Sequence, residues 1–142
     1  MDLGCGKGFL LAELKALLPG LKAEGIDRSK YAVENAHPAV KDNIMCAKIQ
    51  DIGDYDTDMF GLVISLGAFH NLTLRELAKA LPEVERIGKQ AYIMVESFRD
   101  EAEWFNLVCW CLTAETLMRP QDWEFAFKQF GYTGDYEFIY FT

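Results

Sequence analysis

Three glycines near the amino terminus, Gly4, Gly6 and Gly8, form a Gly-x-Gly-x-Gly pattern. Glycine adopts left-handed backbone angles and lets a ligand approach backbone N–H groups closely. A leucine-rich helical pattern follows at once, and the start of a helix presents unpaired N–H groups and a partial positive charge. The pattern predicts a strand end, a ligand-binding turn and a helix. Because many such turns use glycine only for steric reasons, a second feature is needed.

That second feature is Asp27, which ends the run 23–27, the expected second strand. An acid at the end of the second strand of a nucleotide-binding βαβ unit accepts hydrogen bonds from ribose hydroxyls. Aspartate is also a common residue at a helix N-cap. Ser29, however, stands where the cap of the next helix is expected. We therefore predict that Asp27 binds a ribose.

The runs Asp2–Gly8 and Gly25–Asp27 together resemble the class I S-adenosylmethionine-dependent methyltransferases. Their glycine spacing differs from the Gly-x-Gly-x-x-Gly of dinucleotide-binding proteins, which disfavours an NAD-dependent oxidoreductase. The resemblance continues through Phe60–Ser65 and Ala91–Glu96 to the pair Gly131-Tyr132. It implies an enzyme that transfers a methyl group from S-adenosylmethionine, and it says nothing about the acceptor.

The resemblance also implies which residues bind S-adenosylmethionine. It assigns the three glycines to the cofactor turn, Asp2 to orienting that turn or the cofactor amino group, and Asp27 to the ribose. The neighbouring residues complete the predicted site: Cys5, Arg28, Asp51, Ser65 and Gly67. Asp51 follows the third strand, where related enzymes place an acid or amide against the adenine amino group. It is equally well explained as a turn residue in a segment crowded with acids.

His70 is the predicted catalytic residue. It follows the expected strand 60–66, and ligands of open α/β sheets bind at the carboxyl ends of strands. Histidine exchanges protons near neutral pH, as a general base must. A base would help only a hydroxyl or protonated amine acceptor, because the sulfonium is already an activated methyl donor. The alternative, that His70 only orients a loop, stays open.

Hydrophobic periodicity predicts the helices and strands that position these residues. We expect them to form one α/β domain over residues 1–142, with helices on both faces of a Rossmann-like, mostly parallel sheet. The expected strands are 1–3, 23–27, 43–49, 60–66 and 90–97, and the expected helices are 8–18, 29–36, 74–87, 101–112 and 120–130. Thr73 and Glu76 predict a capping box, and Pro82 predicts a kink or break in that helix. The family closes its sheet with an antiparallel strand, which we expect near the carboxyl terminus.

The first strand is expected to be truncated, because only Met1–Leu3 represent it and a parallel strand usually has about 5–6 residues. Either the chain is a fragment or short form, or a second copy or a partner chain completes the strand. Trp104, Trp110 and Trp123 could line an acceptor pocket or such a dimer face. A non-catalytic binding or scaffold domain that lost an N-terminal lid is the alternative function.

The composition narrows the function classes. The net charge of −8 argues against nucleic-acid and anionic membrane partners, since phosphates require a basic face. No apolar run approaches the ~20 residues of a membrane span. The four cysteines form no C-x-x-C pair and no zinc-like spacing, which indicates free thiols in the cytoplasm and no metal site. We therefore expect a cytoplasmic enzyme with a small-molecule acceptor.

Overall fold

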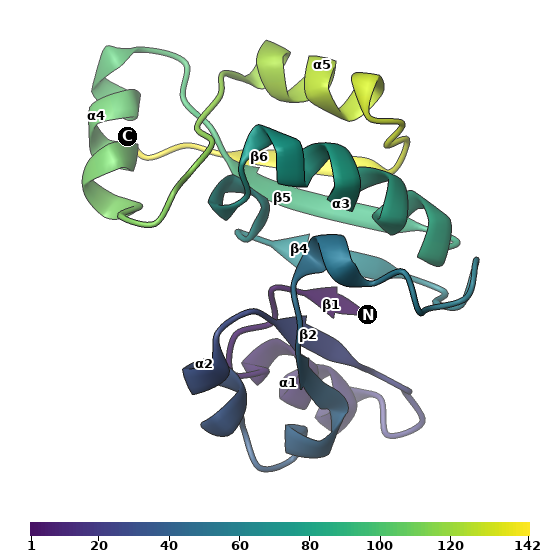
Figure 1. Cartoon of the computed structure of the whole chain (residues 1–142). Coiled ribbons are helices and arrows are strands. Elements are labelled where there is room, and N and C mark those ends of the chain that lie inside the picture. The colour runs from purple at the N-terminus through teal and green to yellow at the C-terminus, as the bar shows by residue number, and fades with distance from the viewer.

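The computed structural model, which describes residues 1–142, has a six-stranded sheet at its centre (Figure 1). The strands are β1 (Asp2–Leu3), β2 (Gly25–Asp27), β3 (Ile44–Cys46), β4 (Val63–Leu66), β5 (Ala91–Glu96) and β6 (Asp135–Ile139). Their order is β3-β2-β1-β4-β5-β6, and every neighbouring pair is parallel. The chain leaves β1 toward β2 on one side and reaches β4 on the other. Ligands of open α/β sheets bind at this switch point.

The helices are α1 (Phe9–Leu17), α2 (Lys30–Glu34), α3 (Leu74–Ile87), α4 (Glu101–Trp110) and α5 (Pro120–Gln129), with short 3-10 turns η1 (Lys41–Asn43), η2 (Ile49–Asp51) and η3 (Phe69–Asn71). The predicted capping box is confirmed, because the side chains of Thr73 and Glu76 each accept from the other's backbone N–H. Pro82 lies inside α3, which stays one helix, so the predicted break is absent. Buried Leu81 and Val84 flank the proline, and their packing offsets the one hydrogen bond that it removes.

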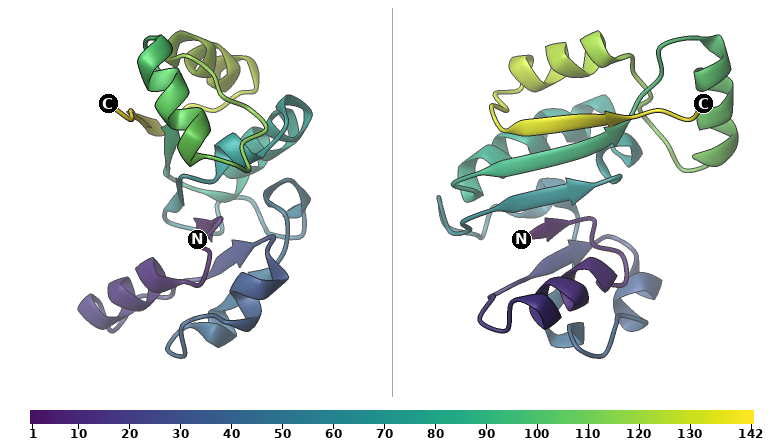
Figure 2. Two further views of the ribbon diagram at one scale, coloured as in Figure 1. Left: turned by 90° about the vertical axis from the view of Figure 1, so that its left-hand side faces the viewer. Right: turned by 180° about the vertical axis from the view of Figure 1, so that it is seen from behind.

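Two apolar clusters fill the two sides of the sheet. The larger cluster joins the strands to α3 and α5 and includes Leu3, Ile93 and Trp123, all fully buried. Trp123 is therefore a core residue, and its predicted place in an acceptor pocket is wrong. The smaller cluster packs Leu11 of α1 against Val40 and its neighbours. Seen from behind, α1 covers the part of the sheet near β1 and β2, and no helix covers the same face of β4, β5 and β6 (Figure 2).

The last strand corrects one prediction. β6 pairs with β5 in parallel, from Tyr92 opposite Asp135 to Glu96 opposite Ile139, so the expected antiparallel strand is wrong. Helices α4 and α5 lie between the two strands in the sequence. A helical crossover of this kind carries the chain back to the starting end of the sheet, which makes the next strand parallel.

Candidate functional site

The turn between β1 and α1 has the backbone that its glycines predict. Gly4, Gly6 and Gly8 have φ angles of 82°, 56° and 74°, in the left-handed region. The N–H of Gly4 donates to the carbonyl of Ile26 at 2.8 Å, which ties the turn to β2. A Cβ atom on Gly4 would clash with the Cβ of Ala68 in the loop after β4. The turn and that loop are therefore in direct contact, and only glycine fits between them.

Asp27 holds the turn from the end of β2. Its Oδ2 accepts a hydrogen bond from the N–H of Gly6 at 2.8 Å, and its Oδ1 accepts from the N–H of Ser29 at 2.8 Å. Ser29 caps α2 by accepting from the N–H of Ala32 at 3.2 Å, as predicted. A carboxylate has about four acceptor positions. Two of them stay available to hydroxyl groups of a ligand.

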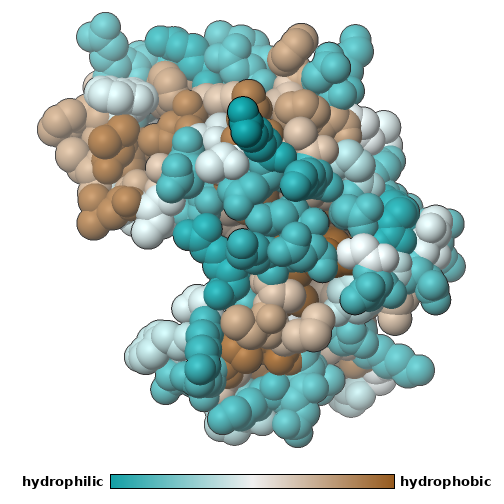
Figure 3. Space-filling view, in the orientation of Figure 1, coloured by the Kyte–Doolittle hydropathy of each residue, from teal (hydrophilic) through white to brown (hydrophobic).

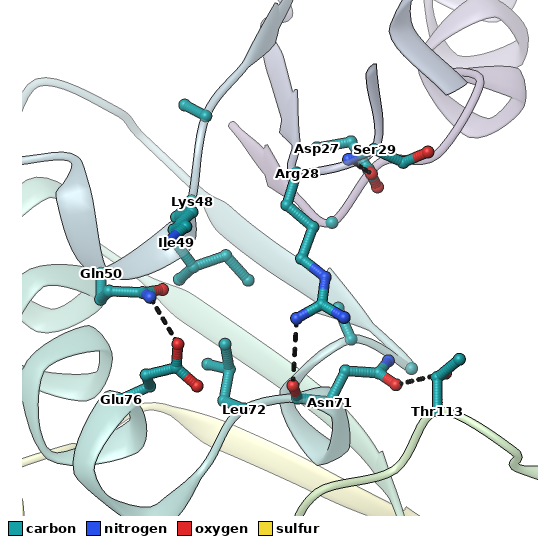
Figure 4. A pocket seen from close by; sticks show the side chains of 14 residues that line it. Asp27, Arg28, Ser29, Lys48, Ile49, Gln50, Asn71, Leu72, Glu76 and Thr113 are labelled. Carbon is teal, nitrogen blue, oxygen red and sulfur yellow. Dashed lines mark hydrogen bonds between the residues drawn. The ribbon is translucent and has the colours of Figure 1, made fainter. Parts of the chain in front are cut away.

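A pocket of about 420 Å³ opens beside Asp27, at the carboxyl ends of the central strands (Figure 4). It is lined by Gly4, Asp27, Arg28, Ser29, Ala47, Lys48, Ile49, Gln50, Gly67, Ala68, Asn71, Leu72, Glu76 and Thr113. The volume lies in the range of about 300–1,000 Å³ that is usual for small-molecule sites. The lining carries two acids and two bases, so no single charge dominates it.

Four predicted residues line this pocket, namely Gly4, Asp27, Arg28 and Gly67. The guanidinium of Arg28 points across the pocket, where its Nη1 donates to the carbonyl of Asn71 at 3.5 Å (Figure 4). The side chain of Asn71 accepts from the hydroxyl of Thr113 at 2.7 Å, in the segment after α4. Segments from three parts of the sequence therefore meet around one cavity.

The other residues predicted from the glycine turn and from β4 are not among the lining residues. Asp2 and Ser65 are buried, and Cys5, Gly6 and Gly8 are not among the lining residues. The hydroxyl of Ser65 donates to the carbonyl of Leu3 at 2.8 Å and ties β4 to β1. Any direct role of these residues in binding stays a prediction.

Asp51 is not among the lining residues, and its predicted contact with adenine stays a prediction. It is exposed at the end of η2 and lies outside the pocket, because the 3-10 turn directs its two predecessors inward instead. Gln50 lines the pocket, where its Nε2 donates to Glu76 at 2.9 Å and its Oε1 is buried without a partner. Gln50 was not among the predicted residues, although an amide is one of the two residue types expected at this point of the chain.

His70 also lies behind the wall. The residue is 3% exposed, and its Nδ1 contacts Oε2 of Glu96, which is also 3% exposed. Neither atom has another hydrogen-bonding partner. A carboxylate oxygen accepts hydrogen bonds, so at this contact Nδ1 is the nitrogen suited to donate. The role of His70 as a general base stays a prediction, and its burial favours a part in orienting the loop.

Burial raises the pKa of Asp2 from 3.8 to about 6. The positive charge of the amino terminus lowers this pKa in part, and the negative charge of Asp27 raises it further. The folded chain thus binds this proton more tightly than the unfolded chain, so the stability that Asp2 contributes is lost as the pH rises from about 4 to about 6. We expect Asp2→Asn, which cannot ionise, to gain roughly 1–3 kcal/mol relative to the unmodified chain across this window. Urea unfolding of both proteins at several pH values measures the gain, and a pH-independent difference would contradict it.

No group of three or more histidine, cysteine or acidic side chains could hold a metal ion. All four cysteines are free. None of the helices combines the length and the apolar character that crossing a membrane requires.

Comparison with known proteins yields one family. Residues 1–95 match a family model described as a methyltransferase domain. No curated protein matches the chain. A SAM-dependent methyltransferase from Archaeoglobus fulgidus has a similar structure, with a TM-score of 0.70 and 19% identity over 92% of this chain and 58% of that chain.

Two further solved structures are similar. One is the Haloferax volcanii Trm112 methyltransferase activator in complex with a proposed methyltransferase, with a TM-score of 0.69 and 21% identity over 92% of this chain and 59% of that chain. The other is the plantazolicin methyltransferase BpumL with a pentazolic desmethylPZN analog and SAH, with a TM-score of 0.63 and 20% identity over 90% of this chain and 53% of that chain. At such identities the likeness establishes the fold. The chain spans less than two thirds of each of these proteins.

Proposed function

The chain belongs to the methyltransferase-domain family, as its class I resemblance predicted, and we propose that it transfers a methyl group from S-adenosylmethionine to a small-molecule acceptor. One observation carries the cofactor part of this proposal. The left-handed glycine turn and the Asp27 carboxylate are joined by a hydrogen bond, and both border the same pocket. The free acceptor positions of Asp27 suit ribose hydroxyls, and the glycine backbone suits close approach by the rest of the cofactor.

The residues of the pocket would bind and orient rather than react. S-adenosylmethionine supplies a methyl group already activated on a sulfonium, so the protein's main task is to align the acceptor with that group. Asp27 would bind the ribose, and the backbone near Gly4 and Gly67 would enclose the amino-acid part. Gln50 would contact the adenine amino group in place of Asp51, because Gln50 lines the pocket and Asp51 does not. His70 would serve as a base only where its Nε2 meets the acceptor.

The acceptor and the partners are further parts of the proposal. The acidic chain disfavours a nucleic-acid acceptor, which leaves a small molecule as the better candidate. The free thiols fit a cytoplasmic protein. Helix α4 exposes Trp104, Phe105 and Trp110, and apolar side chains gather over it (Figure 3). A second copy or a partner protein would cover such a face, and the Haloferax neighbour is itself in a complex with an activator.

Calorimetric titration with S-adenosylhomocysteine tests the cofactor, with NAD as the competing ligand. We expect S-adenosylhomocysteine to bind with a Kd on the order of micromolar, about −8 kcal/mol, and NAD not to bind. Preference for NAD would indicate a dinucleotide-dependent enzyme. Binding of neither ligand would contradict the proposal and favour the scaffold alternative.

A further inference from the structure

A buried acid lies at the end of β5, next to the proposed cofactor site. Glu96 is almost fully enclosed, and its carboxylate contacts the Nδ1 of His70. Removing a charge from water is costly unless a partner compensates for it. Because neither of these two atoms has another hydrogen-bonding partner, each depends on the other. Loss of one side chain would leave the other buried and unpaired.

The carboxylate also lies directly beneath the pocket wall. Gly67 follows β4 with a φ of 69°, and a Cβ built on it would lie 2.9 Å from Oε1 of Glu96. Gly67, Ala68, Asn71 and Leu72 all line the pocket. Glu96 therefore lies close to the wall at Gly67, and through His70 it reaches the chain again three residues later.

The backbone of His70 extends this connection to a distant segment. Its carbonyl accepts hydrogen bonds from the N–H groups of Glu115 and Thr116, both at 3.0 Å. The hydroxyl of Thr116 donates to the carbonyl of Leu72 at 2.7 Å. Thr113, which lines the pocket, is tied to the same wall through its bond to Asn71.

We propose that Glu96 is a positioning residue. Through His70, it holds the wall 67–72 and the segment 113–116 in the arrangement that binds the cofactor. Glu96 does not line the pocket, so its effect on binding is indirect. The binding part of this inference rests on the proposed function. The ordering of the wall is a property of the free chain and can be measured without any ligand.

The test compares three variants by calorimetry with S-adenosylhomocysteine. Glu96→Ala removes the contact, and we expect binding to weaken about tenfold or more, equivalent to about 1.4 kcal/mol. Glu96→Gln keeps an oxygen that accepts from Nδ1–H, so we expect affinity within about threefold of the unmodified chain. Glu137→Ala is the matched control. Glu137 is an exposed acid of β6 and accepts a hydrogen bond from Tyr92 of β5, the strand that carries Glu96. This variant should leave binding unchanged.

Hydrogen exchange of the free chain is the second readout. In Glu96→Ala, the amides of Glu115 and Thr116 should exchange faster, while the amide of Phe130, bonded to Ala126 at the end of α5, should not change. If Glu96→Ala does not fold, Glu96→Leu fills the same space and makes the same test. Unchanged exchange at Glu115 and Thr116 would overturn the inference, as would unchanged affinity in a chain that binds. A chain that binds no ligand but shows the local exchange effect would contradict the proposed function alone.

Discussion

Replacing Asp27 with alanine should strongly weaken S-adenosylhomocysteine binding and destabilise the fold at the same time. The substitution deletes the proposed ribose contact and leaves the N–H groups of Gly6 and Ser29 without their acceptor. Hydrogen bonds to a charged group contribute about 1.5–3 kcal/mol each, less where water replaces the lost partner. We expect affinity to fall at least about 100-fold, or ~2.7 kcal/mol. We expect the free energy of unfolding to fall by roughly 1–3 kcal/mol.

Two further variants separate these effects. Asp27→Asn keeps one carbonyl oxygen, so it should retain part of the stability while binding stays weak. Asp42→Ala removes an exposed acid in η1, outside the pocket, and should change neither quantity. Calorimetry gives the affinities, and urea unfolding gives the stabilities. If Asp27→Ala bound with the affinity of the unmodified chain, the ribose assignment would be wrong and only the role in ordering the turn would remain.

The features predicted correctly from the sequence depend on residues close together in the chain. The glycine turn needs left-handed angles at three nearby positions, and the caps at Ser29 and Thr73 act within one helical turn. Such interactions are encoded locally and can be recognised without the fold. Strand ends are different, because pairing with neighbouring strands decides them. Residues 43–49 were expected to form one strand, yet only Ile44–Cys46 pair with β2.

The features that the sequence could not predict depend on register or on distant contacts. Gln50 lines the pocket and Asp51 does not, because successive residues of the 3-10 turn η2 point in different directions. Glu96 lies near the end of one expected strand and His70 follows another, but nothing in the sequence indicates that their side chains meet. Thr113 reaches the pocket only because the segment after α4 is bonded to η3. The direction of β6 likewise follows from its crossover and not from its own residues.

The Gly4→Ala variant should be the most damaging single-methyl change in the cofactor turn. Its φ of 82° is unfavourable for alanine by about 1–2 kcal/mol. The new Cβ would also clash with the Cβ of Ala68, and overpacking of this kind typically costs about 1–3 kcal/mol. We therefore expect a loss of roughly 2–5 kcal/mol in the free energy of unfolding. Because Gly4 and Ala68 both line the pocket, we also expect S-adenosylhomocysteine binding to be lost.

Gly6→Ala and a compensating double variant separate the backbone cost of Gly4→Ala from the cost of its clash with Ala68. Gly6 has a φ of 56° with no atom near its would-be Cβ, so its replacement should show the backbone cost alone, about 1–2 kcal/mol. In Gly4→Ala with Ala68→Gly, the space is restored and only the backbone cost should remain. Urea unfolding of these proteins, with Ala68→Gly alone as reference, measures each term. If Gly4→Ala cost no more than Gly6→Ala, close contact between the turn and the loop after β4 would not be what requires glycine there.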